Sequence, residues 1–189
     1  MQSSFNRLQL SLIAIMPLLL SVAMSAIALD FTDDQPTEYQ VKAAFLYNFT
    51  KFVEWPDSVF TESQSAITIG ILGDDPFGKD IDNLITGEII KGKKLNVKRF
   101  SRDQNYTDCQ ILFISDSEKD YLDSILKQLK KRPILNVSDI EKFAERGGII
   151  NFVIYQNRVR FEINIDAATQ AGIIISSKLL RLAVIVGER

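Results

Sequence analysis

The 189-residue sequence contains no histidine. Its absence excludes a Ser-His-Asp triad, a histidine general base, a histidine pH switch and the ordinary zinc sites. Cysteine occurs once, as Cys109, so no disulfide can close within the chain. We expect Cys109 to be a small buried residue at the start of a strand. Basic tracts are also missing, so nucleic acid is not an expected partner.

A run of apolar residues long enough to span a membrane is missing too. The longest, Leu8–Leu20, is short for a span and contains Pro17. It follows Arg7 and precedes the small-x-small stretch Ala26-Ile27-Ala28, the arrangement of a cleavable signal peptide. We therefore expect residues 1–28 to be removed near Ala28 on export to the periplasm. Residues 29–36 would be a flexible lead-in, and residues 37–189 a single domain.

The remaining sequence alternates short apolar runs with helical patterns. The predicted strands are Ala66–Leu72, Leu95–Phe100, Ile111–Ile114 and Ile134–Val137. Helices are predicted from Thr37 to about Glu54, after the Asp75-Pro76 cap, at 119–130, from the Ser138-Asp139 cap to Arg146, at 167–171 and at 177–184. This order predicts one α/β domain with a largely parallel open sheet flanked by helices and a C-terminal antiparallel β-hairpin.

The first predicted helix is apolar around most of its circumference. Val41, Phe45, Phe49 and Phe52 form one stripe, and further apolar residues widen it. Such a helix is covered on more than one side. The protein's own core is the usual cover, and a partner or a second copy of the chain is the less common one.

The predicted hairpin spans residues 148–165 and has two contrasting faces. A two-residue Gln156-Asn157 loop places Tyr155 opposite Arg158 and Asn151 opposite Glu162. Because side chains alternate across a sheet, one face is apolar core: Ile150, Phe152, Ile154, Val159, Phe161 and Ile163. The opposite face carries Asn151, Val153, Tyr155, Arg158, Arg160 and Glu162.

The second face has two interpretations. It is either a recognition surface or a solvated sheet face held by the cross-strand pairs Tyr155–Arg158 and Asn151–Glu162. Taken alone, the residue pattern favours the solvated face.

Acidic residues follow three of the predicted strands. Asp74 and Asp75, Asp116 and Asp139 would meet where the strands end, the usual place for ligands in open α/β sheets. They could together hold a divalent cation, but each also stands where it can cap a helix, which is the favoured interpretation. Neither a metal nor a cofactor is therefore expected.

Four blocks of this sequence resemble the YfiR family. They are residues 38–56, Ile69–Gly78, Gly147–Phe152 and the closing pair Val159–Asn164 with Ser176–Ala183. The resemblance covers about residues 38–184. It implies a single α/β domain that tends to dimerise. It also implies a non-enzymatic periplasmic protein that binds the periplasmic region of an inner-membrane diguanylate cyclase, represses it, and so lowers cyclic-di-GMP and biofilm formation.

The resemblance favours the interpretation of the polar hairpin face as a recognition surface. Arg160 and Glu162 lie in a matching block, so we expect them to contribute most to partner or ligand contact. The other candidates are Asn151, Tyr155, Arg158, Lys178 and Arg181. The redox control of the family's type member depends on disulfides and is not expected with Cys109 alone. Two alternatives remain: a small-molecule receptor with its pocket near Asp74–Phe77, and, remotely, a hydrolase with a carboxylate site.

Overall fold

The computed structural model describes residues 35–60 and 65–187. Residues 1–35 and 36–189 form two units, and every described helix and strand lies in the second. The predicted signal peptide and most of the predicted lead-in lie outside the described residues. Within the described ranges, no helix has both the length and the apolar character needed to cross a bilayer.

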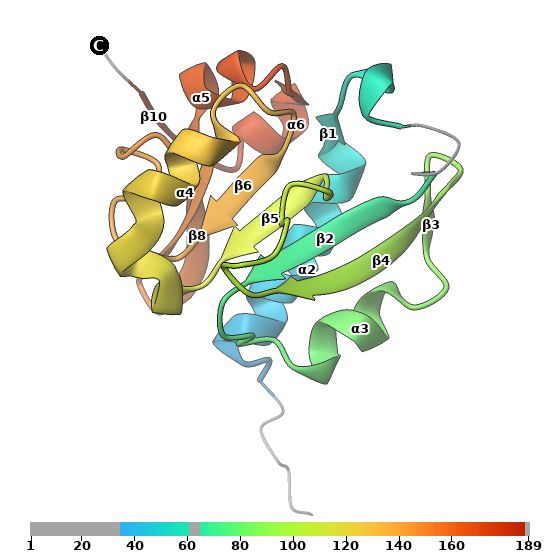
Figure 1. The fold of residues 1–189 in the computed structure, drawn as a ribbon. Helices are drawn as coiled ribbons and strands as arrows, with labels where there is room; N and C mark the ends of the chain where they lie inside the picture. The colour runs from blue at the N-terminus through green and yellow to red at the C-terminus, as the bar shows by residue number, and fades with distance from the viewer. Residues whose placement is uncertain (1–34, 61–64, 188–189) are drawn as a thin grey trace, which may run out of the picture. The chain divides into compact units, whose positions relative to one another are not determined.

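Strands and helices alternate along the chain and form a mixed α/β domain (Figure 1). The strands are β1 (Val53–Glu54), β2 (Ile67–Leu72), β3 (Ile89–Ile90), β4 (Lys93–Phe100), β5 (Ile111–Ile114), β6 (Leu135–Ser138), β7 (Ile150–Tyr155), β8 (Arg158–Asn164), β9 (Ile174–Ile175) and β10 (Val184–Val186). The α-helices are α2 (Glu38–Phe52), α3 (Lys79–Ile85), α4 (Leu122–Leu129), α5 (Ile165–Gln170) and α6 (Ser177–Leu180).

Eight strands form one sheet in the order β10-β8-β7-β6-β5-β2-β4-β3. All neighbours are parallel except β7 with β8 and β3 with β4. Every residue of β2, β5 and β6 is buried, as expected for parallel strands covered on both faces. The predicted fold class, a largely parallel sheet with an antiparallel hairpin, is therefore confirmed.

Two apolar clusters cover the two faces of the sheet. Helices α2 and α3 pack on one face, in the larger cluster, and α4 packs on the other (Figure 1). Cys109 belongs to the α4 cluster, is 3% exposed and precedes β5, as predicted. The protein's own core thus accounts for the apolar character of α2, which contacts α3, α6 and β8.

The N-terminal capping box of α2 is confirmed. The side chain of Thr37 accepts from the Gln40 amide, and the Gln40 side chain accepts from the Thr37 amide. The helix ends at Phe52, two residues before the predicted Glu54, because Val53 and Glu54 pair with β9.

Other predicted boundaries are wrong for local reasons. Helix α3 begins at Lys79 after Gly78, and Asp75 instead accepts from the amides of Phe77 and Gly78 in a turn. The segment 116–121 is a 3₁₀ helix, so α4 starts only at Leu122.

Two further predicted helices are also corrected. Residues 139–147 form successive turns instead of the helix expected there. Helix α6 is capped by Ser176 but ends at Leu180 instead of residue 184, and the chain then enters β10, a strand that was not predicted.

Candidate interaction surface

The β7–β8 hairpin has the predicted register. Tyr155 pairs with Arg158 and Asn151 pairs with Glu162. Gln156 and Asn157 both have positive φ, at 50° and 56°, as a two-residue type I′ turn requires. The weak turn preference of glutamine at the first position does not shift the strands, because a slip by one residue would expose the buried phenylalanines.

The hairpin extends beyond the parallel sheet. β7 pairs with β6 only at Ile150 and Asn151, and β8 pairs with β10 only from Glu162 onward. Within the described residues, residues 152–161 therefore form a two-stranded arm with no further strand on either side. We call these residues the hairpin arm.

Aromatic packing holds the base of the hairpin arm against α2. Phe152 and Phe161 are each 2% exposed. Phe45 lies 6.0 Å from Phe152 and 5.2 Å from Phe161 between ring centroids, and Phe49 lies 6.0 Å and 5.5 Å from the same two rings. Four rings at these distances make the arm a rigid projection instead of a loose loop.

The outer part of the hairpin arm is exposed. Tyr155 is 63% exposed and Ile154 is 52% exposed. Arg158 and Arg160 are also exposed, and within the described chain neither makes an ion pair or hydrogen bond. The prediction that Ile154 faces the core is wrong, because the strand has passed beyond the cover of α2 at this point.

Asn151 does not lie on an exposed face. It is 1% exposed, and its Nδ2 donates to the carbonyls of Ser138, Ile140 and Phe152. The predicted placement of Asn151 on an open recognition surface is therefore wrong, because the turns of residues 139–147 cover it. Neither predicted cross-strand contact forms among the described side chains: Tyr155 and Arg158 make no cation–π contact, and Asn151 makes no hydrogen bond to Glu162.

Glu162 is half-buried at the base of the hairpin arm. Burial raises the pKa of its carboxyl above the ordinary value of 4.5, and the negative charge of Glu145 raises this pKa further. Glu162 thus differs from the exposed Arg158 and Arg160 in the same strand, since it is half-buried and the charge of a second carboxylate acts on it.

Lys178 and Arg181 are exposed at α6, apart from the hairpin arm. Helix α6 packs against α2 through Leu179. Among the described elements, α6 makes its main contacts with α2 and has no comparable contact with β7 or β8. The structure therefore brings Tyr155, Arg158 and Arg160 together and leaves Lys178 and Arg181 separate.

Exposed apolar residues beside β8 were missed by the sequence analysis. Val184 pairs with Glu162 across β10 and β8, and it is 58% exposed. Leu182, just before β10, is 66% exposed. The β-branched run Val184-Ile185-Val186 was the signal for an edge strand, but Val184 was taken as the end of the predicted helix and the next two residues were assigned to no element.

The predicted strand-end carboxylates do not form one cluster. Asp75 receives a hydrogen bond from Arg99 Nε at 2.8 Å, and Asp116 pairs with Lys119 at 3.5 Å. Among the described residues, no group of three acidic or cysteine side chains could hold a metal ion. Asp74 lines a shallow pocket of about 660 Å³ beside Arg99 and Arg102, and Phe77 is buried in the core.

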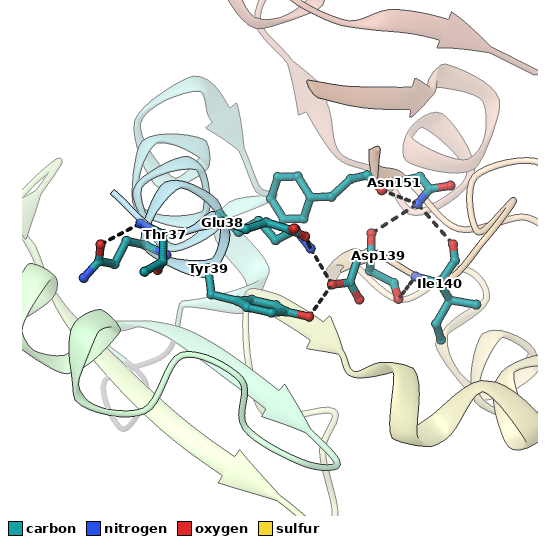
Figure 2. A network of polar contacts seen from close by, with 10 residues as sticks. Thr37, Glu38, Tyr39, Asp139, Ile140 and Asn151 are labelled. Carbon is teal, nitrogen blue, oxygen red and sulfur yellow. Dashed lines mark hydrogen bonds and ion pairs between the residues drawn. The ribbon is translucent and has the colours of Figure 1, made fainter. Parts of the chain in front are cut away.

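Asp139 has a different role from the predicted helix cap. Its Oδ2 accepts from Lys42 Nζ at 2.6 Å and from the Tyr39 hydroxyl at 3.0 Å (Figure 2). Lys42 also contacts Glu38 one turn away. Burial and the Asp139 carboxylate raise the pKa of Tyr39 to about 12, so this hydroxyl stays protonated and donates. This network fastens the N-terminus of α2 to the end of β6.

The family model described as YfiR/HmsC-like matches residues 39–184, well over half of the chain. The matched range begins at the second residue of α2 and ends at the first residue of β10, so it contains the hairpin and the Asp139 network. A comparison with curated proteins found no match.

Proposed function

The chain belongs to the YfiR/HmsC-like family, and from that premise we propose that it is a non-enzymatic periplasmic regulator. In this proposal it binds the periplasmic region of an inner-membrane diguanylate cyclase and represses the enzyme. Repression lowers cyclic-di-GMP and biofilm formation. The mature chain reaches the periplasm after removal of residues 1–28, so cell fractionation should recover a shortened protein there.

The hairpin arm is the observation that carries this proposal. It projects past the neighbouring strands and is held rigid by Phe45 and Phe49 beneath it. A rigid projection loses little conformational entropy on binding, which favours recognition by a partner. Its exposed side chains include an aromatic residue and two arginines, the types that contribute most at protein interfaces.

The charge of the hairpin arm suggests the kind of partner surface. Arg158 and Arg160 lack carboxylate partners within the described residues, so an acidic patch on the cyclase would complement them. Tyr155 at the tip, on the same face as the two arginines, would fill an apolar pocket beside that patch. Leu182 and Val184 extend the apolar contact along the neighbouring edge.

The residues that catalysis would need are missing or already paired, which also agrees with a role in binding. The chain has no histidine, and Asp75 is paired with Arg99 where a carboxylate-based catalyst would need it free. The proposal holds for a monomer and for a homodimer, since all the residues assigned to cyclase contact lie on one chain.

The test measures cyclic-di-GMP in cells in which the gene is deleted and then restored. Deletion should raise cyclic-di-GMP, and the wild-type gene should lower it again. The double variant Tyr155→Ala/Arg160→Glu should fail to do so at equal abundance, because it removes the aromatic anchor and reverses the central charge. The tagged wild type should also capture a diguanylate cyclase from envelope extracts, and the double variant should not.

A matched control changes the same charge at the far side of the sheet. Lys94 in β4 is exposed, and its side chain has no partner in the described chain. The variant Lys94→Glu should therefore repress the cyclase like the wild type. Unchanged cyclic-di-GMP on deletion would overturn the regulatory role. Full repression by the double variant would overturn the hairpin arm as the contact.

A further inference from the structure

The two edge strands of the eight-stranded sheet, β3 and β10, differ in their protection against pairing with another chain (Figure 1). β3 consists of Ile89 and Ile90, which pair with Lys94 and Lys93 of β4. Lysines along an edge discourage the addition of a further strand. β10 lacks this protection, because residues 182–187, Leu-Ala-Val-Ile-Val-Gly, contain no charged residue and no proline.

The apolar side chains of β10 stand largely in solvent. Val184 is 58% exposed and Ile185 is 49% exposed. Three consecutive β-branched residues favour an extended chain that packs within a sheet. One edge of β10 nevertheless faces no other strand among the described residues. An uncharged edge of this kind is a template for a further strand.

The register of the sheet shows which backbone groups of β10 are free. The Asn164 amide of β8 donates to the carbonyl just before β7, so its neighbour Ile163 directs its N–H and C=O to the opposite side, toward β10. Ile163 is the parallel partner of Ile185 and therefore bonds the residues on either side of it, Val184 and Val186. The N–H and C=O of Ile185 then point outward, where no other described strand lies.

The sequence of this edge fits a second copy of itself. In an antiparallel pair with a two-fold axis at Ile185, the outward N–H of each Ile185 donates to the C=O of the other. Val184 of one copy lies opposite Val186 of the second copy. The next pair is Ala183 with Gly187, so residues of matched size meet along the seam and no like charges oppose each other.

The charges at the two ends of the edge fit the same pairing. Asp166 lies beside Gly187, with its Oδ2 3.1 Å from the place where a Cβ of that glycine would be. Asp166 and Arg181 are both exposed and make no ion pair within the described residues. Because Gly187 pairs with Ala183, Asp166 of one copy and Arg181 of the second copy stand at the same end of the seam. Opposite charges at both ends favour a second copy as the occupant.

We propose that two copies of this chain pair through β10, antiparallel about a two-fold axis at Ile185, and so join their sheets into one. The axis is perpendicular to the sheet, so equivalent faces of the two copies lie on the same side. Arg158 and Arg160 stand on the face opposite the buried Phe161. The dimer therefore presents two hairpin arms on one side. Pairing uses the backbone edge and leaves the outer side of Val184 open, and the dimer does not depend on the proposed cyclase.

The experiment is sedimentation equilibrium of the purified mature chain. The wild type should form a dimer that dissociates on dilution. Ile185→Lys and Ile185→Glu each place like charges opposite each other at the axis, so each should weaken self-association by about tenfold or more. An equimolar mixture of the two variants should associate again, because the lysine of one copy then faces the glutamate of the other. This rescue also excludes unfolding of the single variants as the cause of the loss.

The control Ile89→Lys makes the same change at an exposed residue of the other edge strand, and it should leave the dimer unchanged. The inference is overturned if the wild type is a monomer even at millimolar concentration. It is also overturned if Ile185→Lys associates as strongly as the wild type, or if the mixture of the two variants stays monomeric. No cyclase is present in these measurements, so their outcome is independent of the cyclic-di-GMP test.

Discussion

Lys42 and Asp139 lie 97 positions apart in the sequence and meet at 2.6 Å in the fold. The ammonium group is buried, with its side chain 3% exposed, while that of Asp139 is 12% exposed. The pair joins the first helix to the loop after β6. Removing one partner of such a pair leaves a charge in a poorly solvated place.

We therefore expect Asp139→Asn to lower the free energy of unfolding by about 3 kcal/mol, near the low end for a broken buried pair because Glu38 still contacts Lys42. Urea denaturation measures this change. Adding Lys42→Met should restore most of the loss, since methionine fills the space without a charge. If the double variant is as unstable as the single one, the unpaired ammonium is not the cause.

The carboxyl of Glu162 should make stability depend on pH. Its pKa is raised in the folded protein by burial and by Glu145, so the unfolded chain releases this proton at lower pH. The contribution of Glu162 to stability is thus complete below its ordinary pKa of 4.5 and is lost as the pH rises through the folded value.

It follows that Glu162→Gln should be more stable than the wild type at pH 7 and equally stable near pH 4. Thermal unfolding at the two pH values measures the difference, and Glu54→Gln, a change at an exposed position, should show no gain. Equal melting temperatures of wild type and Glu162→Gln at pH 7 would contradict the expectation that burial and the charge of Glu145 disfavour the ionised Glu162 carboxylate.

Cys109 should be unreactive in the folded protein. Burial raises the pKa of its thiol to about 12, and the Sγ donates to the Tyr106 carbonyl. The thiolate is the form that attacks a disulfide reagent, and it is almost absent at pH 8 under these conditions. Labelling with a chromogenic disulfide should be complete in urea and negligible without it. Rapid labelling of the native chain would contradict this expectation, because it would mean that the Cys109 thiol becomes accessible to solvent in the folded protein.

Gly148 should tolerate no side chain, because a Cβ there would lie 2.1 Å from Phe143 Cε1. The Phe143 ring is fully buried and cannot move aside freely. We expect Gly148→Ala to destabilise the domain by about 1–3 kcal/mol, as overpacking does. The shorter side chain in Gly148→Ala/Phe143→Leu should recover part of that loss, measured by the same denaturation. If Phe143→Leu instead adds its own destabilisation to that of Gly148→Ala, a Cβ at position 148 does not clash with the Phe143 ring.

The hairpin was predictable because its determinants are local. Turn length and alternation set the register of residues 150–163, and the apolar set Phe152 and Phe161 could face the core in only one way. The buried runs Ile67–Leu72 and Ile111–Ile114 likewise predicted parallel strands, since they are apolar on both faces. These features need no knowledge of distant partners.

Features that depend on neighbouring segments could not be predicted in this way. Alternation placed Asn151 and Tyr155 on one face, yet the former is buried and the latter is exposed. The difference arises because the turns after β6 cover only the base of the hairpin. The same packing turned Asp139 from an expected helix cap into the partner of Lys42.

The sequence by itself determined the order of the main strands, the hairpin register and the absence of histidine and disulfide chemistry, because these depend on composition and on neighbours a few residues apart. Only the tertiary structure decided which polar groups are left without partners and which side chains project into solvent. Those properties depend on how far each strand extends past the next and on which distant segment packs over it.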